Sequence, residues 1–233
     1  SPAGQPGLRE PHGLPIFTFQ PGKGAHMADT SRFWDRLADR YAAQPIADED
    51  AYQHKLEVTR SHFTPQSRVL EFGCGTGSTA LLHAPSVQHI HAIDFSARML
   101  EKARQRAADA GVDNVTFEQG DITSIAVEPG RYDMVLGLSI LHLLKDRQAV
   151  IARVYDMLKP GGRFVSSTAC LGDSMKWFGY IAPLGRALGL LPMLNVMTPD
   201  QLRADLIKIG LVIEHDWRPA PQAALFLIAR KPD

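Results

Sequence analysis

The stretch that decides the fold is Val69–Gly77, which reads VLEFGCGTG. An apolar run that ends in Gly73, Gly75 and Gly77 is typical of a strand that turns into the first turn of a helix. Glycine at alternate positions lets backbone amides approach a ligand closely, and the following helix offers unpaired amide donors at its start. Tight turns without a cofactor also contain such glycines, so the neighbouring segments decide what this one means.

The chain on either side of this loop alternates short apolar runs with helical patterns, as parallel sheets covered by helices on both faces do. Strands are expected at Arg68–Phe72, His89–Asp94, Val115–Gln119, Tyr132–Gly137 and Arg163–Ser167. Helices are expected at Ser96–Ala110, where Ser96 is the N-cap, at Asp146–Leu158 before Pro160, Gly161 and Gly162, and from Thr198 to Ile209. Two further strands, near Leu211–Asp216 and Ala223–Ala229, have a short connection, which predicts an antiparallel hairpin at the edge.

The remaining segments suggest one domain with additions. Residues 1–26 are rich in Pro and Gly and lack the apolar core of a signal peptide, so we interpret them as a vector-derived or disordered leader. Residues 27–233 are expected to form a single domain, with a helical cap over 29–63 and a lid-like insert over 169–197. The apolar insert could instead be a pair of core helices or an amphipathic segment at a membrane surface.

Composition excludes several classes of partner. The chain has 25 basic and 25 acidic residues and no densely basic window, which disfavours nucleic acid. Its two cysteines, Cys74 and Cys170, have no metal-ligand spacing, so no metal is expected and a reducing cytoplasm is the natural location. No apolar run reaches about 18 residues, so we expect a soluble protein without a transmembrane segment. The sequence indicates no oligomeric state.

Three acids lie at the ends of three successive strands. Glu71 lies two residues before the first glycine, where it can accept hydrogen bonds from an amino group. Asp94 closes the second strand, where doubly wound folds present an acid to ribose hydroxyls. Asp121 follows the third strand in EQGDI and can accept from an adenine amino group, while the Ile122 amide donates to a ring nitrogen. The three acids are therefore expected to line one crevice.

Other residues near these ends are candidates for the site. Phe95 follows the second strand and can stack on an adenine face or pack in the core, and Cys74 is expected to act through its backbone, without a redox role. His142, in SILHLL, is the candidate general base, because an ordinary histidine titrates near about pH 6.5. Packing among leucines is the alternative for His142. Asp173 and His54 are weaker candidates for the base.

The ordered motifs VLEFGCGTG, AIDFS, QGDI, YDMVLGLSILHLL and LKPGGRFV resemble those of the class I S-adenosylmethionine-dependent methyltransferases, and of their small-molecule branch. The resemblance covers residues 41–233. It implies a doubly wound α/β fold with a seven-stranded, mostly parallel sheet of order 3-2-1-4-5-7-6. It also implies that the glycine loop holds the methionine moiety of S-adenosylmethionine, Asp94 the ribose and Asp121 the adenine. A nicotinamide dehydrogenase is disfavoured, because Ser78 stands where its GxGxxG fingerprint needs a third glycine.

By the same resemblance, further cofactor contacts are expected. Met99 would lie beneath the adenine, Tyr41 and Lys55 near the methionine carboxylate, and Gly120 and Leu138 at the ends of their motifs. Ordinary packing is the alternative for Met99 and Tyr41, and a solvated charge is the alternative for Lys55.

The methyl acceptor is expected to be a small, apolar molecule. The Asp/Asn-Pro-Pro-aromatic motif of amino-methylating branches and the Pro-Cys nucleophile of the cytosine-carbon branch are both absent from the sequence. The residues leave open whether O, N, S or C accepts the methyl group, and whether a base is used. Two alternatives are a lipid or quinone methyltransferase at a membrane surface, and a cofactor-binding protein without catalytic activity.

Overall fold

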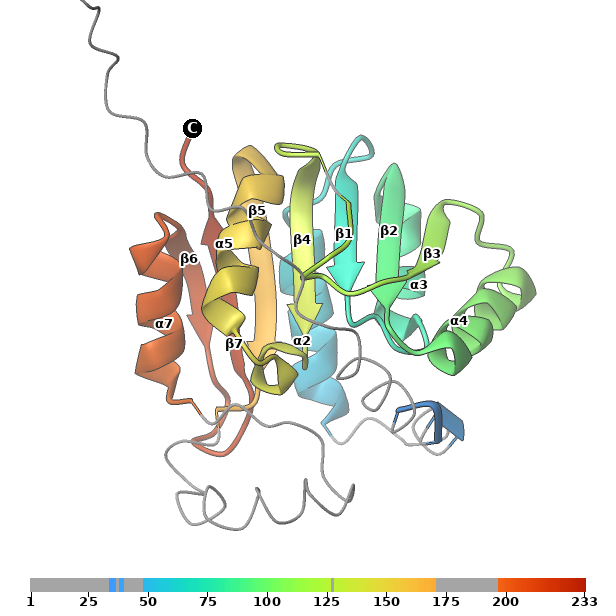
Figure 1. Cartoon of the computed structure of the whole chain (residues 1–233), viewed down its shortest axis with the longest axis horizontal. Coiled ribbons are helices and arrows are strands. Elements are labelled where there is room, and N and C mark those ends of the chain that lie inside the picture. Colours follow the sequence, from blue (N-terminus) through green and yellow to red (C-terminus); the bar gives the residue numbers. More distant parts are fainter. Residues whose placement is uncertain (1–33, 37, 40–47, 127, 171–196) are drawn as a thin grey trace, which may run out of the picture.

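The computed structural model describes residues 34–36, 38–39, 48–126, 128–170 and 197–233 (Figure 1). The predicted leader, Tyr41, Asp173 and residues 171–196 of the predicted insert lie outside the described residues.

In the described part of the chain, seven strands form one sheet of order β3-β2-β1-β4-β5-β7-β6, as the resemblance implied (Figure 1). The pairs from β3 to β5 are parallel, and β7 is antiparallel to both β5 and β6. The strands are β1 Arg68–Phe72, β2 His89–Asp94, β3 Val115–Gln119, β4 Tyr132–Leu138, β5 Leu158–Thr168, β6 Val212–Trp217 and β7 Leu225–Arg230. The predicted fold class is confirmed, including the antiparallel hairpin at the edge.

Helices cover both faces of the sheet. In Figure 1, α5 lies in front of the sheet and α2 and α3 lie behind it. The helices are α2 Glu49–Arg60, α3 Ser78–His83, α4 Ala97–Asp109, α5 Arg147–Met157 and α7 Pro199–Lys208, with short 3-10 turns η1 Ala84–Ser86 and η2 Leu141–Leu143. The predicted cap of α4 is present, because the Ser96 hydroxyl accepts a hydrogen bond from the Met99 amide at 3.2 Å.

Each face of the sheet has its own apolar core, because successive residues of a strand point to opposite sides. Phe72 and Phe164 pack with residues of α5 and α7 in one cluster. Val69 and Val165 pack in a second cluster with residues of α3 and α4. Glu71 has the same parity as Val69, so its side chain is directed toward the α2 and α3 side of the sheet.

The start of β5 differs from the prediction. We expected the helix to stop at Pro160–Gly162 and a strand to begin at Arg163, but the strand begins at Leu158, directly after α5. The Gly161 amide donates to the Lys231 carbonyl at 3.0 Å, and the Lys231 amide donates to the Gly162 carbonyl at 2.8 Å. The prediction was wrong because this backbone partner lies at the far end of the chain, where no local pattern indicates it.

Gly137 in β4 leaves space for an aromatic ring at the centre of the sheet. A Cβ at this position would lie 2.4 Å from Cζ of Phe72, whose ring is buried and stacks on Phe164 with 6.3 Å between ring centroids. We expect Gly137→Ala to lower the free energy of unfolding by about 2–3 kcal/mol, because a packed ring must move to admit one methyl group. Urea denaturation measures this change.

Gly111→Ala is the matched control. Gly111 has a φ of 64° with nothing within 4 Å of its Cβ position, so the replacement introduces backbone strain without a collision. Its expected cost is about 1–2 kcal/mol. Wild-type stability in Gly137→Ala would show that the ring moves freely and would contradict the packing argument.

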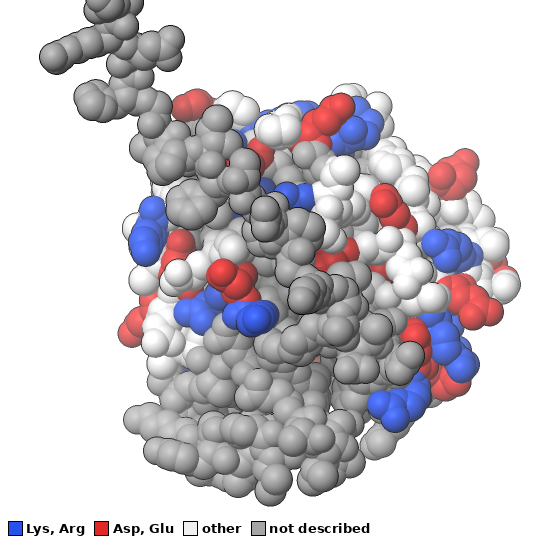
Figure 2. Space-filling model, in the orientation of Figure 1, with Lys and Arg blue, Asp and Glu red and all other residues white. Residues whose placement is uncertain are grey.

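The distribution of charge on the surface and the length of the helices bear on possible nucleic acid and membrane partners. On the face that Figure 2 displays, basic and acidic side chains of the described residues are interspersed rather than gathered by sign. Within the described ranges, every helix is too short or too polar to cross a bilayer.

Candidate active site

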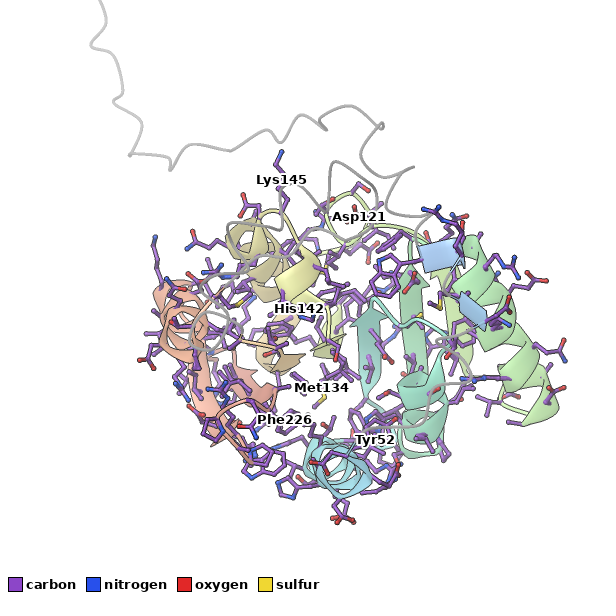
Figure 3. All side chains as sticks on the ribbon, turned by 90° about the horizontal axis from the view of Figure 1, so that it is seen from below. Tyr52, Asp121, Met134, His142, Lys145 and Phe226 are labelled. Atoms are coloured by element: carbon purple, nitrogen blue, oxygen red, sulfur yellow. The ribbon has the colours of Figure 1, made fainter. Side chains whose placement is uncertain are left out.

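The candidate site lies at the carboxyl ends of the parallel strands, which form the edge of the sheet that faces the viewer in Figure 3. The loop after β1 has three glycines at positive φ: 67° at Gly73, 53° at Gly75 and 75° at Gly77. A Cβ on Gly73 would lie 2.8 Å from Ile140, and one on Gly77 would lie 3.0 Å from Ala103. The positive φ and the packing within the protein therefore require glycine at these two positions. The glycine pattern alone indicates a different reason, the close approach of a ligand to the backbone.

Glu71, the penultimate residue of β1, is a buried acid with only 3% of its surface exposed. Its Oε2 atom has no hydrogen-bond partner among the described residues. Burial, with a smaller contribution from the Asp94 carboxylate, raises the pKa of Glu71 to about 8. The alternative of a solvated charge is therefore wrong, and the side chain has an unused position for a hydrogen-bond donor.

Asp94 ends β2 and ties the glycine loop to the start of α4. Its Oδ2 atom accepts from the Gly75 amide at 2.8 Å, and its Oδ1 atom accepts from the Ser96 amide at 2.9 Å. Burial raises the pKa of Asp94, while these two amides act in the opposite direction. The loop, β2 and α4 are thus held together by one carboxylate.

A second group of predicted residues lies near the ends of β2 and β3. Met99 and Ile122 are buried, and Phe95 is partly buried. The Gly120 amide donates to the Asp94 carbonyl at 3.0 Å, which joins the two strand ends. The Asp121 carboxylate accepts from the Thr123 amide at 2.8 Å and forms a tight turn beside them.

Helix α2 brings polar side chains to the opposite side of the sheet from η2; Figure 3 shows Tyr52 on this side and His142 on the other. Lys55 donates through Nζ to the Ser167 hydroxyl of β5 at 3.0 Å, and burial lowers the pKa of Lys55. The Tyr52 hydroxyl lies 3.1 Å from the hydroxyl of Thr79 in α3. Ser167 was not predicted as a site residue; its partnership with Lys55 joins distant segments and has no sequence signal.

His142 lies in η2, next to the glycine loop. Ile140, two residues earlier, is the residue that packs against Gly73. The Nδ1 atom of His142 is buried and has no hydrogen-bond partner among the described residues, and burial lowers its pKa. The imidazole is therefore neutral at pH 7, with a nitrogen available to a ligand.

The backbone between β4 and η2 is strained at Ser139, which has a φ of 56° although it is not glycine. Its amide donates to the Ser167 carbonyl at 2.7 Å, which fixes the direction in which the chain leaves Leu138. Strain of this kind persists where surrounding structure determines the conformation, often at functional sites. Sequence reasoning did not single out Ser139.

His54, a weaker candidate for the base, and the Cys74 thiol both lie in surroundings that differ from those of His142. His54 packs against the ring of Trp217, with 4.4 Å between centroids, and lies near His215 on the outer strands. Cys74 is buried, and burial raises the pKa of its thiol. Among the residues that the structure describes, no group of three or more His, Cys, Asp and Glu side chains could hold a metal ion.

Comparison with known proteins identifies a matching family. The model of the methyltransferase domain family matches residues 63–191, which include the glycine loop, the three acids and His142. An uncharacterized methyltransferase, YcgJ of Bacillus subtilis, is 34% identical over 110 residues, which are 47% of this chain and 44% of the relative. The demethylmenaquinone methyltransferase of Symbiobacterium thermophilum is 29% identical over 155 residues, 64% of this chain and 60% of the relative. The chain thus spans about half the length of these relatives.

The fold is also shared with solved structures. The [4+2]-cyclase SpnF has a TM-score of 0.71 and 17% identity to this chain, and the match covers 87% of this chain and 94% of the cyclase. At this identity the likeness shows the fold alone, so the residues of the site must carry the argument about chemistry.

Proposed function

We propose that this chain, which belongs to the methyltransferase domain family, transfers the methyl group of S-adenosylmethionine to a small, apolar acceptor. The observation that carries the proposal is the buried Glu71 carboxyl, which has an oxygen without a partner in the described part of the chain and lies beside a loop whose glycines all have positive φ. A buried polar atom without a partner costs free energy, so such a site suits a ligand that supplies a donor.

The residues around Glu71 fit the methionine end of this cofactor. We assign Glu71 to its amino group and the loop residues Gly73, Cys74 and Gly75 to the adjoining backbone contacts. The Lys55 ammonium donates to the Ser167 hydroxyl, a neutral partner, and is suited to bind the carboxylate of the methionine moiety. Tyr41 is assigned to the same group by resemblance, and Leu138 to the wall beside it.

The ends of β2 and β3 fit the adenosine end. Asp94 is already held by two amides, and each of its oxygens has a further lone pair for a ribose hydroxyl. We assign the adenine amino group to Asp121 and a ring nitrogen to the Ile122 amide. The walls of this subsite are assigned to Phe95, Met99 and Gly120.

When bound, S-adenosylmethionine supplies a methyl group that its sulfonium already activates. The protein therefore contributes mainly proximity and orientation of the acceptor. His142 is suited to take a proton from a hydroxyl or carbon acid, because its imidazole is neutral and its Nδ1 atom is free among the described residues. The demethylmenaquinone named for one relative favours an apolar acceptor.

Turnover of labelled S-adenosylmethionine against thiols, amines, phenols and quinols tests the proposal. We expect label to be transferred to an apolar phenol or quinol and not to a charged amine. Turnover that requires added liposomes would indicate the lipid or quinone reaction at a membrane surface. Calorimetric binding of the cofactor without transfer to any of these classes would contradict the proposed reaction and favour a cofactor-binding protein.

A further inference from the structure

Among the described residues, no cation compensates Glu71 in the candidate cofactor site. The titratable groups that face it are Asp94 from β2, Tyr52 from α2 and Cys74 from the glycine loop. All three of these groups are neutral or anionic. On α2, the Lys55 ammonium donates to the Ser167 hydroxyl at 3.0 Å.

The two buried carboxyls of the site differ in the support that they receive. Asp94 accepts hydrogen bonds from the Gly75 and Ser96 amides, which favour its ionised form. Glu71 is 3% exposed, and its Oε2 atom has no donor among the described residues. Two ionised carboxylates in one buried site repel each other, so a proton shared between them belongs on Glu71.

We infer that Glu71 is a neutral carboxylic acid in the ligand-free protein and ionises when the ammonium group of the cofactor reaches its free oxygen. The inference rests on the proposed function, because it requires a ligand with an ammonium group. The step is balanced: the Glu71 O–H bond breaks, its proton passes to the solvent, and the carboxylate and the ammonium remain as a pair. Cofactor binding therefore releases a proton.

The consequence is a dependence of cofactor affinity on pH. Burial and Asp94 raise the pKa of Glu71 to about 8, so most of the ligand-free protein carries this proton at pH 7. Linkage then requires the affinity to rise by roughly ninefold from pH 6 to pH 7, because nearly one proton leaves for each cofactor bound. The site binds its ammonium ligand weakly in acid and more strongly near the pKa of Glu71.

Calorimetry of S-adenosylhomocysteine binding to the full chain measures the proton directly. At pH 7, titrations in two buffers with different ionisation enthalpies give the number of protons released. We expect roughly 0.9 protons per cofactor for the wild type. In infrared difference spectra, the band of a protonated carboxyl group is expected to disappear on binding.

Three comparisons assign the proton to Glu71 and to the amino group. Glu71→Gln is expected to release no proton and to lose the ninefold dependence on pH. Glu57→Gln, at an exposed acid on α2, is expected to release as many protons as the wild type. The analogue 5′-methylthioadenosine, which lacks the amino acid moiety, is expected to bind without releasing a proton.

The outcomes separate this inference from the proposed function. Cofactor binding at pH 7 without proton release would overturn the inference and leave the proposed function intact. Absence of binding across the pH range would overturn both. If Glu71→Gln fails to fold, the proton count of the wild type and the analogue experiment still decide between these results.

Discussion

Replacing Glu71 with Gln is expected to stabilise the ligand-free protein at pH 9 by up to about 5 kcal/mol, and to leave its stability near pH 4.5 almost unchanged. The reason is the buried position of the side chain, which raises its pKa from 4.5 to about 8. Each unit of difference between the folded and unfolded pKa corresponds to about 1.4 kcal/mol. Gln has a similar shape and carries no charge to bury.

The direction of this stability change depends on whether the folded or the unfolded state binds the Glu71 proton more tightly. The pKa of Glu71 is higher in the folded protein than in the unfolded chain. The free energy of unfolding is therefore highest below pH 4.5, where Glu71 is protonated in both states, and it falls as the pH rises to about 8. Urea denaturation of wild type and Glu71→Gln at pH 5, 7 and 9 measures the growing difference. Titrating groups far from Glu71 contribute equally in both proteins, so their contributions cancel in the comparison. Asp94 is the exception, because its charge adds to the raised pKa of Glu71, and the measured difference therefore includes the coupling between the two carboxyls.

The same replacement is expected to weaken cofactor binding at pH 8 by roughly 10- to 100-fold. A neutral amide makes a weaker hydrogen bond to an ammonium group than a carboxylate does, by about 1.5–3 kcal/mol. Glu57→Gln is the control, because its side chain is exposed on α2, and it should change neither property. Equal dependence of stability on pH in wild type and Glu71→Gln would show that Glu71 is already ionised in the folded protein.

Replacing His142 with Ala is expected to lower the rate of methyl transfer to a hydroxyl acceptor by roughly 10²-fold or more, without weakening cofactor binding. A correctly placed general base contributes about 10²- to 10⁴-fold. His142 is suited to that role because it lies close to the glycine loop: Ile140, the residue just before η2, packs against Gly73. Single-turnover rates with labelled cofactor and calorimetric affinities separate the two effects.

The pH profile distinguishes a base from a packing residue. Burial lowers the pKa of His142 below its usual 6.5, so the wild-type rate should be flat above neutral pH and fall as the pH drops through the lowered value. The profile of His142→Gln should lack this fall, because an amide of similar size takes no proton. His62→Ala is the control, since burial also lowers the pKa of His62 but this residue faces Arg163 of β5 and Glu214 of β6. An unchanged rate in His142→Ala would remove His142 from the mechanism.

Local patterns were sufficient for most of the elements. The bounds of β1, β2 and β3 agree with the prediction. Apolar residues dominate β1, whereas apolar and polar residues alternate along most of β2 and β3, and both patterns are local signals of a strand. The Ser96 cap was also readable, since capping depends on residues within one turn of the helix. The strand order came from the resemblance of five motifs, because periodicity alone does not say which strands are neighbours.

The sequence by itself determined that Glu71, Asp94 and Asp121 lie at the ends of successive strands, and hence that they share one edge of a parallel sheet. Only the tertiary structure decided what each acid does there. Asp94 is bound by two amides, whereas Glu71 is buried without a donor among the described residues, and sequence spacing is silent on this difference. The contacts of Lys55 with Ser167 and of Gly73 with Ile140 were hidden for the same reason. Strands and caps depend on residues close in the chain, whereas burial, and with it the charge state of a carboxyl, depends on which distant segments pack around it.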